Sequence, residues 1–201
     1  MKMTDISAKM VKELREKSGA GIMDCKEALI ETGGDMQKAI DFLRKKGLAT
    51  AAKRAGRATG QGTIQSYIHM GGKIGVMVEV NCETDFVAKT DDFLAFARNL
   101  AMHIAATSPV GITVEDVPDA VLTREKEIYR DQALEMGKPE KMIDKIVAGK
   151  LNKFFKESCL MNQQYVKDPD KTITDYLNEI VAKTGEKVEI KRFARFQVGA
   201  A

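Results

Sequence analysis

A glycine turn between two alternating segments places the strongest constraint on the fold of this chain. Apolar and polar residues alternate over residues 63–70 and again over 74–80, and a Gly-Gly-Lys sequence at 71–73 separates the two segments. A period of two is typical of strands with one buried face, and glycine pairs form tight hairpin turns. The pattern therefore predicts an antiparallel β-hairpin that begins at Thr63 and has His69 on its outer face.

Helical periodicity precedes this hairpin. The first fifty residues carry the i, i+3, i+4 apolar spacing of three short helices. We expect the second helix from Ile22 to Glu31, and the third to begin after Asp35 as its N-cap and to end at Gly47. Residues 48–62 are rich in Ala, Gly, Lys and Arg, which indicates a helical start that dissolves into a flexible linker. We therefore predict a three-helix module over residues 1–55 and a linker over 56–62.

The rest of the chain mixes helices with one further strand. Helical patterns occupy about 91–107, 120–136, 139–158 and 173–184, and a strand pattern covers 188–198. The two charged helices in the middle are expected to form an antiparallel hairpin, about 120–165, that projects into solvent. The last strand is expected to complete the sheet. Strands and helices do not alternate regularly, so the predicted fold class is α+β, with a core over residues 63–201.

Composition narrows the class of partner. The formal net charge of the 201 residues is +3, which is low for a dedicated nucleic-acid binder, so no direct nucleic-acid contact is expected. Three scattered cysteines, Cys25, Cys82 and Cys159, suit a reducing compartment. The N-terminus, MKMTD, turns quickly polar and begins no signal-type stretch, and no apolar run reaches the roughly 20 residues of a membrane span. These features predict a cytoplasmic protein without a membrane partner.

No pattern indicates covalent chemistry. The glycines at 19–21 start like a dinucleotide fingerprint, but the sixth position is Asp24 and the segment joins two helices. Neither histidine, at 69 and 103, has a partner at metal-ligand spacing. Cys82 lies beside a glutamate, yet a small buried residue at a strand end is the favoured interpretation. Lys53, Arg54 and Arg57 fit a solvated linker face better than a phosphate site. We therefore expect no catalytic residue, no metal site, no cofactor and no enzyme activity.

The segment that follows the second strand breaks the alternation. Residues 83–87 read Glu-Thr-Asp-Phe-Val and lie between a strand pattern and a helix pattern. Spacing alone favours a structural role, in which Phe86 covers the core and Asp85 caps a helix. A second interpretation is that the segment is exposed and presses into a partner. The pattern by itself leaves both interpretations open.

Several motifs together resemble one protein family. Residues 14–26 (LREKSGAGIMDCK) and 78–89 (VEVNCETDFVAK) look like the two signatures of elongation factor Ts, the exchange factor of the translational GTPase elongation factor Tu. Residues 101–106 (AMHIAA) and 137–139 (GKP) also match, in the family's order. At position 22 an isoleucine stands where other members often have methionine, a conservative change for an apolar contact.

The resemblance implies a fold and a function. It implies that the N-terminal module is ubiquitin-associated-like and grips a helix of the GTPase domain through Arg15, Ile22 and Met23. It also implies that Thr84, Asp85, Phe86 and Val87 act against the GTPase near its magnesium ion, with Asp85 and Phe86 as a wedge. The expected function is acceleration of GDP release from elongation factor Tu, so that GTP can bind.

The length of the chain implies an oligomer. Longer family members duplicate the core subdomain, whereas this chain carries one copy of the wedge and of the helix at 102–105 and so resembles the short form. In that form two chains tend to pair, so a homodimer and a two-plus-two complex are expected.

Other classes of function remain open from the residues alone. An adaptor would use the three-helix module without exchange activity and would leave residues 84–87 without a role. An RNA-associated protein would use the three basic residues near the linker, and its binding would depend strongly on salt.

Overall fold

The computed structural model describes residues 6–54 and 56–200. Two expectations lie outside the described residues, namely the polar beginning of the chain at 1–5 and the module boundary at residue 55. The described residues form two compact units, here called unit 1 and unit 2. Unit 1 contains the described residues of Met1–Tyr67, Met77–Ala101 and Asp175–Ala194. Unit 2 contains the described residues of Ile68–Val76, Met102–Thr174 and Arg195–Ala201.

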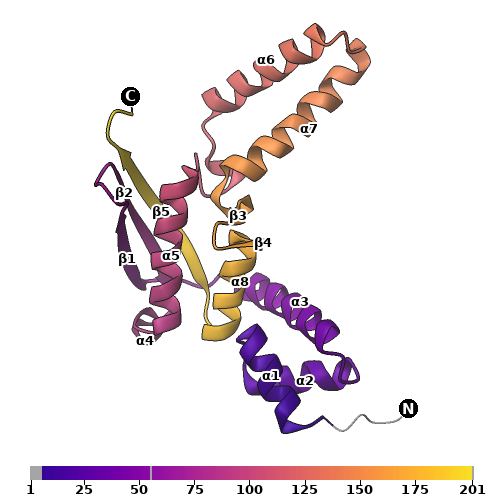
Figure 1. Ribbon diagram of the computed structural model, residues 1–201, viewed down its shortest axis with the longest axis vertical. Helices are drawn as coiled ribbons and strands as arrows, with labels where there is room; N and C mark the ends of the chain where they lie inside the picture. Colours follow the sequence, from indigo (N-terminus) through magenta and orange to yellow (C-terminus); the bar gives the residue numbers. More distant parts are fainter. Residues whose placement is uncertain (1–5, 55, 201) are drawn as a thin grey trace. The chain divides into compact units, whose positions relative to one another are not determined.

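Three helices form a small bundle at the start of unit 1 (Figure 1). They are α1 (Ala8–Ser18), α2 (Ile22–Glu31) and α3 (Met36–Arg54), so the predicted bounds of α2 are confirmed. Asp35 accepts a hydrogen bond from the backbone N–H of Lys38 at 3.0 Å, which confirms it as the N-cap of α3. The apolar stripes of the helices meet in one core, formed by Leu14, Ala20, Cys25, Ala28, Leu29, Ala39 and Leu43.

The prediction that Gly47 ends the third helix is wrong, because α3 continues through it to Arg54. A glycine inside a helix costs about 1 kcal/mol relative to alanine, and packing offsets this cost here. A Cβ atom at position 47 would lie 3.9 Å from the Cβ of Ala182 and 3.9 Å from the carbonyl oxygen of Asn178. Both residues belong to α8 (Ile173–Thr184), so α3 is supported by a close neighbour where the sequence alone indicates an end.

The sheet has three strands, β1 (Gln61–Ile68), β2 (Ile74–Cys82) and β5 (Val188–Gln197), in the order β1-β2-β5. The glycines at 71 and 72 adopt φ values of 87° and 68°, a left-handed conformation that glycine reaches without strain. The predicted hairpin turn is therefore confirmed, as is the return of the last strand to the sheet. With helices packed on an antiparallel sheet, the predicted α+β class is confirmed.

The apolar residues of β1 face away from the core, contrary to the expectation from alternation. Ile64 and Ile68 are exposed, whereas Thr63, Gln65 and Tyr67 are half-buried. On β2 the apolar set is buried as expected, at Val76, Val78, Val80 and Cys82. Alternation predicts the period of a strand but not which face is covered, and β1 is an edge strand with one open face.

Two helices follow β2 in the chain. The first, α4 (Asp85–Ala88), has a single turn, and the second, α5 (Asp91–Thr107), has the predicted bounds. Phe93, Phe96, Leu100 and Ile104 are fully buried, as their helical spacing predicts. Within unit 1 the ring of Phe96 packs edge-on against that of Tyr176 of α8, with 4.8 Å between the centroids.

Unit 2 contains the predicted helical hairpin. Helices α6 (Asp119–Glu135) and α7 (Glu140–Ser158) run side by side (Figure 1). Shorter elements complete the unit: the 3-10 helices η1 (Val114–Asp116) and η2 (Leu160–Asn162) and the antiparallel pair β3 (Gln164–Tyr165) and β4 (Asp168–Thr172). The β3–β4 pair is absent from the sequence-based expectations because its strands are very short and β4 contains a proline. Among the described residues, no helix is long and apolar enough to cross a bilayer.

A buried histidine lies inside unit 2. His103 is fully buried, its Nε2 lies 3.0 Å from Oε1 of Gln163, and its Nδ1 accepts the N–H of Val166 at 3.4 Å. These bonds place the hydrogen on Nε2 and leave the ring neutral. Burial lowers the pKa of His103 below its ordinary 6.5, against a smaller raising effect of Gln163.

This histidine predicts a pH-dependent stability. Because the pKa of His103 is lower in the folded state, the unfolded chain binds a proton near pH 6.5 that the folded chain does not. The free energy of unfolding therefore falls as the pH drops below about 6.5, by at most about 1.4 kcal/mol per pH unit for one group. Urea unfolding at pH 7.0 and 5.5, as approximate reference points, measures this slope. His103→Gln is expected to flatten it, and His69→Gln, at the exposed second histidine, to retain it. An unchanged slope in His103→Gln would contradict the assignment.

Candidate functional site

The segment that breaks the strand pattern forms an exposed, capped turn. Thr84 is the N-cap of α4, and its hydroxyl accepts the backbone N–H of Val87 at 3.4 Å. Val87 is 9% exposed and fastens the turn to the core, whereas Phe86 is 80% exposed. The interpretation in which Phe86 covers the core and Asp85 caps the helix is therefore wrong, because Thr84 supplies the cap and the Phe86 ring points away from the buried side.

The carboxylate of Asp85 is held on the same short helix. Lys89 donates a hydrogen bond to Oδ2 of Asp85 at 2.8 Å, and both side chains are at least half exposed. This bond, together with the positive charge of Lys89, lowers the pKa of the Asp85 carboxyl. Asp85 therefore presents an ionised carboxylate beside the exposed ring of Phe86.

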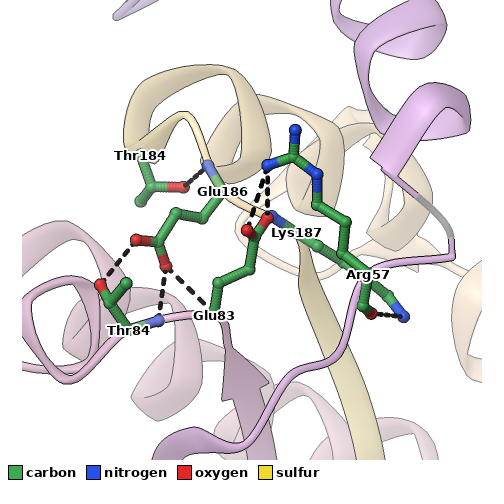
Figure 2. Close-up of polar contacts among 6 residues, drawn as sticks. All are labelled: Arg57, Glu83, Thr84, Thr184, Glu186 and Lys187. Atoms are coloured by element: carbon green, nitrogen blue, oxygen red, sulfur yellow. Dashed lines mark hydrogen bonds and ion pairs between the residues drawn. The ribbon is translucent and has the colours of Figure 1, made fainter.

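A glutamate that lies about 100 residues later in the chain holds the base of this turn (Figure 2). Oε2 of Glu186 accepts the backbone N–H of Glu83 at 3.1 Å and that of Thr84 at 3.0 Å. Oε1 of Glu186 accepts the hydroxyl of Thr84 at 2.6 Å. One carboxylate thus satisfies three donors at the start of α4.

A second glutamate makes the opposite connection (Figure 2). Oε1 of Glu83 accepts the backbone N–H of Lys187 at 2.6 Å, and Oε2 lies 3.1 Å from Nη1 of Arg57. The N–H of Lys187 is the main cause that lowers the pKa of the Glu83 carboxyl, with Arg57 adding to it. The ammonium of Lys187 also donates to the carbonyl oxygen of Arg57 at 3.0 Å. Arg57, which the sequence suggests as part of a solvated linker face, is therefore partnered.

The thiol at the end of β2 is inert. Cys82 is fully buried, and its Sγ donates to the carbonyl oxygen of Thr84 at 3.1 Å. Burial, with a contribution from the charge of Glu186, raises the pKa of Cys82 to about 11. A nucleophilic cysteine needs a lowered pKa, so the structural interpretation of Cys82 is confirmed.

A groove lies on the N-terminal bundle of unit 1. It has a volume of about 520 Å³ and is lined by apolar and basic residues, namely Ile6, Ala8, Val11, Lys12, Arg15, Ile22 and Lys26. The structure thus brings together two of the three residues that the resemblance selects in this module, Arg15 and Ile22. The third, Met23, is 74% exposed but does not line the groove.

The geometry is that of a contact surface. An exposed aromatic ring on a turn held by hydrogen bonds and a groove lined by apolar and basic residues both suit recognition of another protein. Among the residues that the structure describes, no group of three or more His, Cys, Asp or Glu side chains is arranged to hold a metal ion. Sequence reasoning missed Glu186 and Lys187, because no local pattern marks a contact between segments so far apart in the chain.

Comparison with known proteins finds relatives along the whole chain. The sequence profile of the family described as Elongation factor TS matches residues 2–200. Elongation factor Ts of Desulfosudis oleivorans is 71% identical over 197 residues, which cover 98% of this chain and 100% of the relative. Elongation factor Ts of Desulfotalea psychrophila is 63% identical over 195 residues, with 97% and 99% covered. For that of Caldanaerobacter subterraneus the identity is 60% over 194 residues, with 96% and 97% covered. The similarity therefore extends over both units.

Proposed function

We propose that this chain, which belongs to the elongation factor Ts family and is a translation elongation factor, accelerates GDP release from elongation factor Tu. In this proposal Phe86 and Asp85 press against the GTPase near its nucleotide and magnesium site. The observation that carries the proposal is the exposure of Phe86 on a turn that is fixed at both ends. An 80% exposed aromatic side chain held in one place is a feature of a binding anchor rather than of a core.

Insertion of this ring accounts for exchange in physical terms. Nucleotide and Mg²⁺ in such a GTPase are held by backbone N–H groups, a lysine and a few oxygen ligands. Close-packed interiors transmit displacement, so a ring forced between partner elements shifts those ligands. Factor and nucleotide then weaken each other's binding reciprocally, by about 1.4 kcal/mol for each tenfold change in affinity. The factor therefore speeds release without changing the overall equilibrium between free GDP and GTP.

The groove of the N-terminal bundle is proposed to hold the partner. Ile22 is 55% exposed and lines the groove with other apolar residues, and Lys12, Arg15 and Lys26 add positive charge to the lining. Such a surface fits a helix with an apolar stripe and acidic neighbours, as in other helix-in-groove contacts. We assign affinity mainly to this groove and the rate of release mainly to Phe86. The module is proposed to be ubiquitin-associated-like and to include the exposed Met23 in the contact.

A homodimer is proposed from exposed apolar residues in unit 2. Ile68, Met70, Phe196 and Val198 are all exposed there. The N–H of Val198 donates to the carbonyl oxygen of Lys73 at 2.9 Å, which fixes the end of β5 beside the β1–β2 turn. Exposed apolar side chains on neighbouring segments of a sheet suit an interface. A second copy of the chain as occupant gives a two-plus-two complex with elongation factor Tu.

Light scattering tests the dimer. We expect the wild-type protein to have twice the 22.2 kDa mass of one chain. Ile68→Lys combined with Phe196→Lys opposes like charges across a two-fold interface and is expected to give a monomer. Met136→Lys, at an exposed methionine after α6, is the control and is expected to leave the mass unchanged. A wild-type mass of one chain at micromolar concentration would contradict the dimer.

We further propose that the protein is not an enzyme and that it works in the cytoplasm, where a translation factor meets its GTPase. The competing proposal of an adaptor predicts binding without effect on the nucleotide. The experiment that separates the two follows the loss of a fluorescent GDP analogue from elongation factor Tu, with excess unlabelled GDP, in the presence and absence of this protein. Binding without faster loss would favour the adaptor and contradict exchange.

A further inference from the structure

We propose that Glu186 and Glu83 are positioning residues that fix the direction of Phe86, an inference that rests on the exchange function proposed above. The two carboxylates form a reciprocal connection, which we call the glutamate latch. Each glutamate accepts the backbone N–H of the other's segment: Glu186 binds the N–H groups of Glu83 and Thr84, and Glu83 binds the N–H of Lys187.

The helix that carries Phe86 needs such an external support. A helix of one turn fixes many dihedral angles for few hydrogen bonds, so α4 is unstable by itself. Thr84 links the latch to the helix, because its hydroxyl donates to Glu186 at 2.6 Å and accepts the N–H of Val87 at 3.4 Å. The latch therefore fixes the cap, and the cap fixes the direction of the next residues, including Phe86.

The other side of the latch is itself held in place. Glu186 and Lys187 follow directly on α8, and the N–H of Glu186 donates to the hydroxyl of Thr184 at 3.4 Å (Figure 2). The hydroxyl of Thr184 donates in turn to the carbonyl oxygen of Ile180 at 2.8 Å. The turn that carries Phe86 is thereby tied to the end of a helix of twelve residues.

A cation pairs with one of the two carboxylates of the latch. Arg57 forms an ion pair with Glu83 at 3.1 Å, and the ammonium of Lys187 lies 3.1 Å from Glu189 and donates to the carbonyl oxygen of Arg57. The hydrogen bond and positive charge of Arg57 add to the larger effect of the Lys187 N–H in lowering the pKa of the Glu83 carboxyl. Arg57 belongs to the segment that follows α3, so the latch also ties that segment to the base of α4.

The latch is expected to act on rate rather than on affinity. The latch makes no bond to the buried side chain of Val87, which we expect to stay in place when the latch is lost. The groove of the N-terminal bundle is not part of the latch. Loss of the latch leaves Phe86 present but free to sample several directions. A ring that is not preorganised must be ordered at the moment it displaces partner groups, which slows release from the bound complex.

The test measures the maximal rate of GDP release from elongation factor Tu and the concentration of this protein that gives half of it. Glu186→Ala is expected to lower the maximal rate about tenfold and to change the half-saturating concentration less than about threefold. Glu186→Gln keeps the shape: one oxygen accepts both N–H groups, and the amide donates to the Thr84 hydroxyl. It is expected to retain at least about a third of the maximal rate. Asp170→Ala, at an exposed carboxylate of β4, is the control and is expected to match the wild type.

A second readout does not depend on the partner. Hydrogen exchange of the Glu83 and Thr84 amides is expected to be faster in Glu186→Ala than in the wild type and nearly unchanged in Glu186→Gln. Glu83→Ala removes the other half of the latch, the bond to the N–H of Lys187. Its maximal rate of GDP release provides the same test should Glu186→Ala not fold. If Phe86→Ala slows release while Glu186→Ala keeps the wild-type maximal rate, the positioning role is overturned and the exchange function stands. If the wild type does not accelerate release, the exchange function fails, and the amide exchange still tests the latch.

Discussion

Replacing Phe86 by alanine is expected to lower the maximal rate of GDP release from elongation factor Tu by roughly 30-fold. Truncation of an anchoring aromatic side chain costs about 2 kcal/mol, and about 1.4 kcal/mol corresponds to a tenfold change in rate. The fold should not suffer, because Phe86 is 80% exposed and exposed substitutions usually change the free energy of unfolding by less than about 0.5 kcal/mol. Stopped-flow release of a fluorescent GDP analogue at saturating factor measures the rate, and urea unfolding measures the stability.

The controls separate the wedge from a general loss of apolar surface. Val166→Ala shortens another exposed apolar side chain, at the β3–β4 turn, and is expected to leave the rate unchanged. Asp85→Ala combined with Phe86→Ala is expected to be slower than Phe86→Ala alone, because the double variant also removes the ionised carboxylate held by Lys89. A double variant that exchanges at the wild-type rate would show that these residues are not the wedge, even within this family.

Replacing Ile22 by alanine is expected to weaken binding to elongation factor Tu without slowing GDP release from the bound complex. Ile22 lines the groove, and burial of such a side chain against a partner contributes about 2 kcal/mol. The half-saturating concentration should therefore rise roughly 10- to 30-fold. The maximal rate at saturation should stay within about twofold, because a residue that contributes only to binding affects the ground state and the transition state equally.

The same helix supplies a matched control. Ile30 also lies on α2 and is 57% exposed, close to the 55% of Ile22, but it does not line the groove. Ile30→Ala is therefore expected to leave both kinetic parameters unchanged. Equal effects of the two substitutions would contradict the assignment of binding to the groove, and a lower maximal rate in Ile22→Ala would contradict the division of roles between the groove and Phe86.

Elements with strong local signals could be predicted from the sequence. The bounds of α2, α5 and α8 match the ranges of their helical patterns, and the glycine turn at 71–72 specifies the hairpin. The end of α3 could not be predicted, because the support for Gly47 comes from α8, far along the chain. The orientation of β1 could not be predicted either, since a period of two fits both faces of an edge strand.

The candidate site likewise has parts that could be predicted from the sequence and parts that could not. The unusual sequence at residues 83–87 marks the turn, and the exposure of Phe86 rules out the interpretation in which this ring covers the core. The latch could not be predicted, because Glu186 looks like any charged residue after a helix. Its significance comes from three donors that lie about 100 residues earlier in the chain. In the N-terminal module, the resemblance alone selected Arg15, Ile22 and Met23. The structure shows that Arg15 and Ile22 line the groove and that Met23 does not.

The most direct measurement is the rate at which a fluorescent GDP analogue leaves elongation factor Tu as the concentration of this protein is raised, with excess unlabelled GDP present. For an exchange factor with a Phe86 wedge, the rate should rise with concentration to a plateau well above spontaneous release, and Phe86→Ala should reach a much lower plateau at a similar half-saturating concentration. A release rate that stays at the spontaneous value at micromolar concentrations of the wild-type protein would contradict the exchange function.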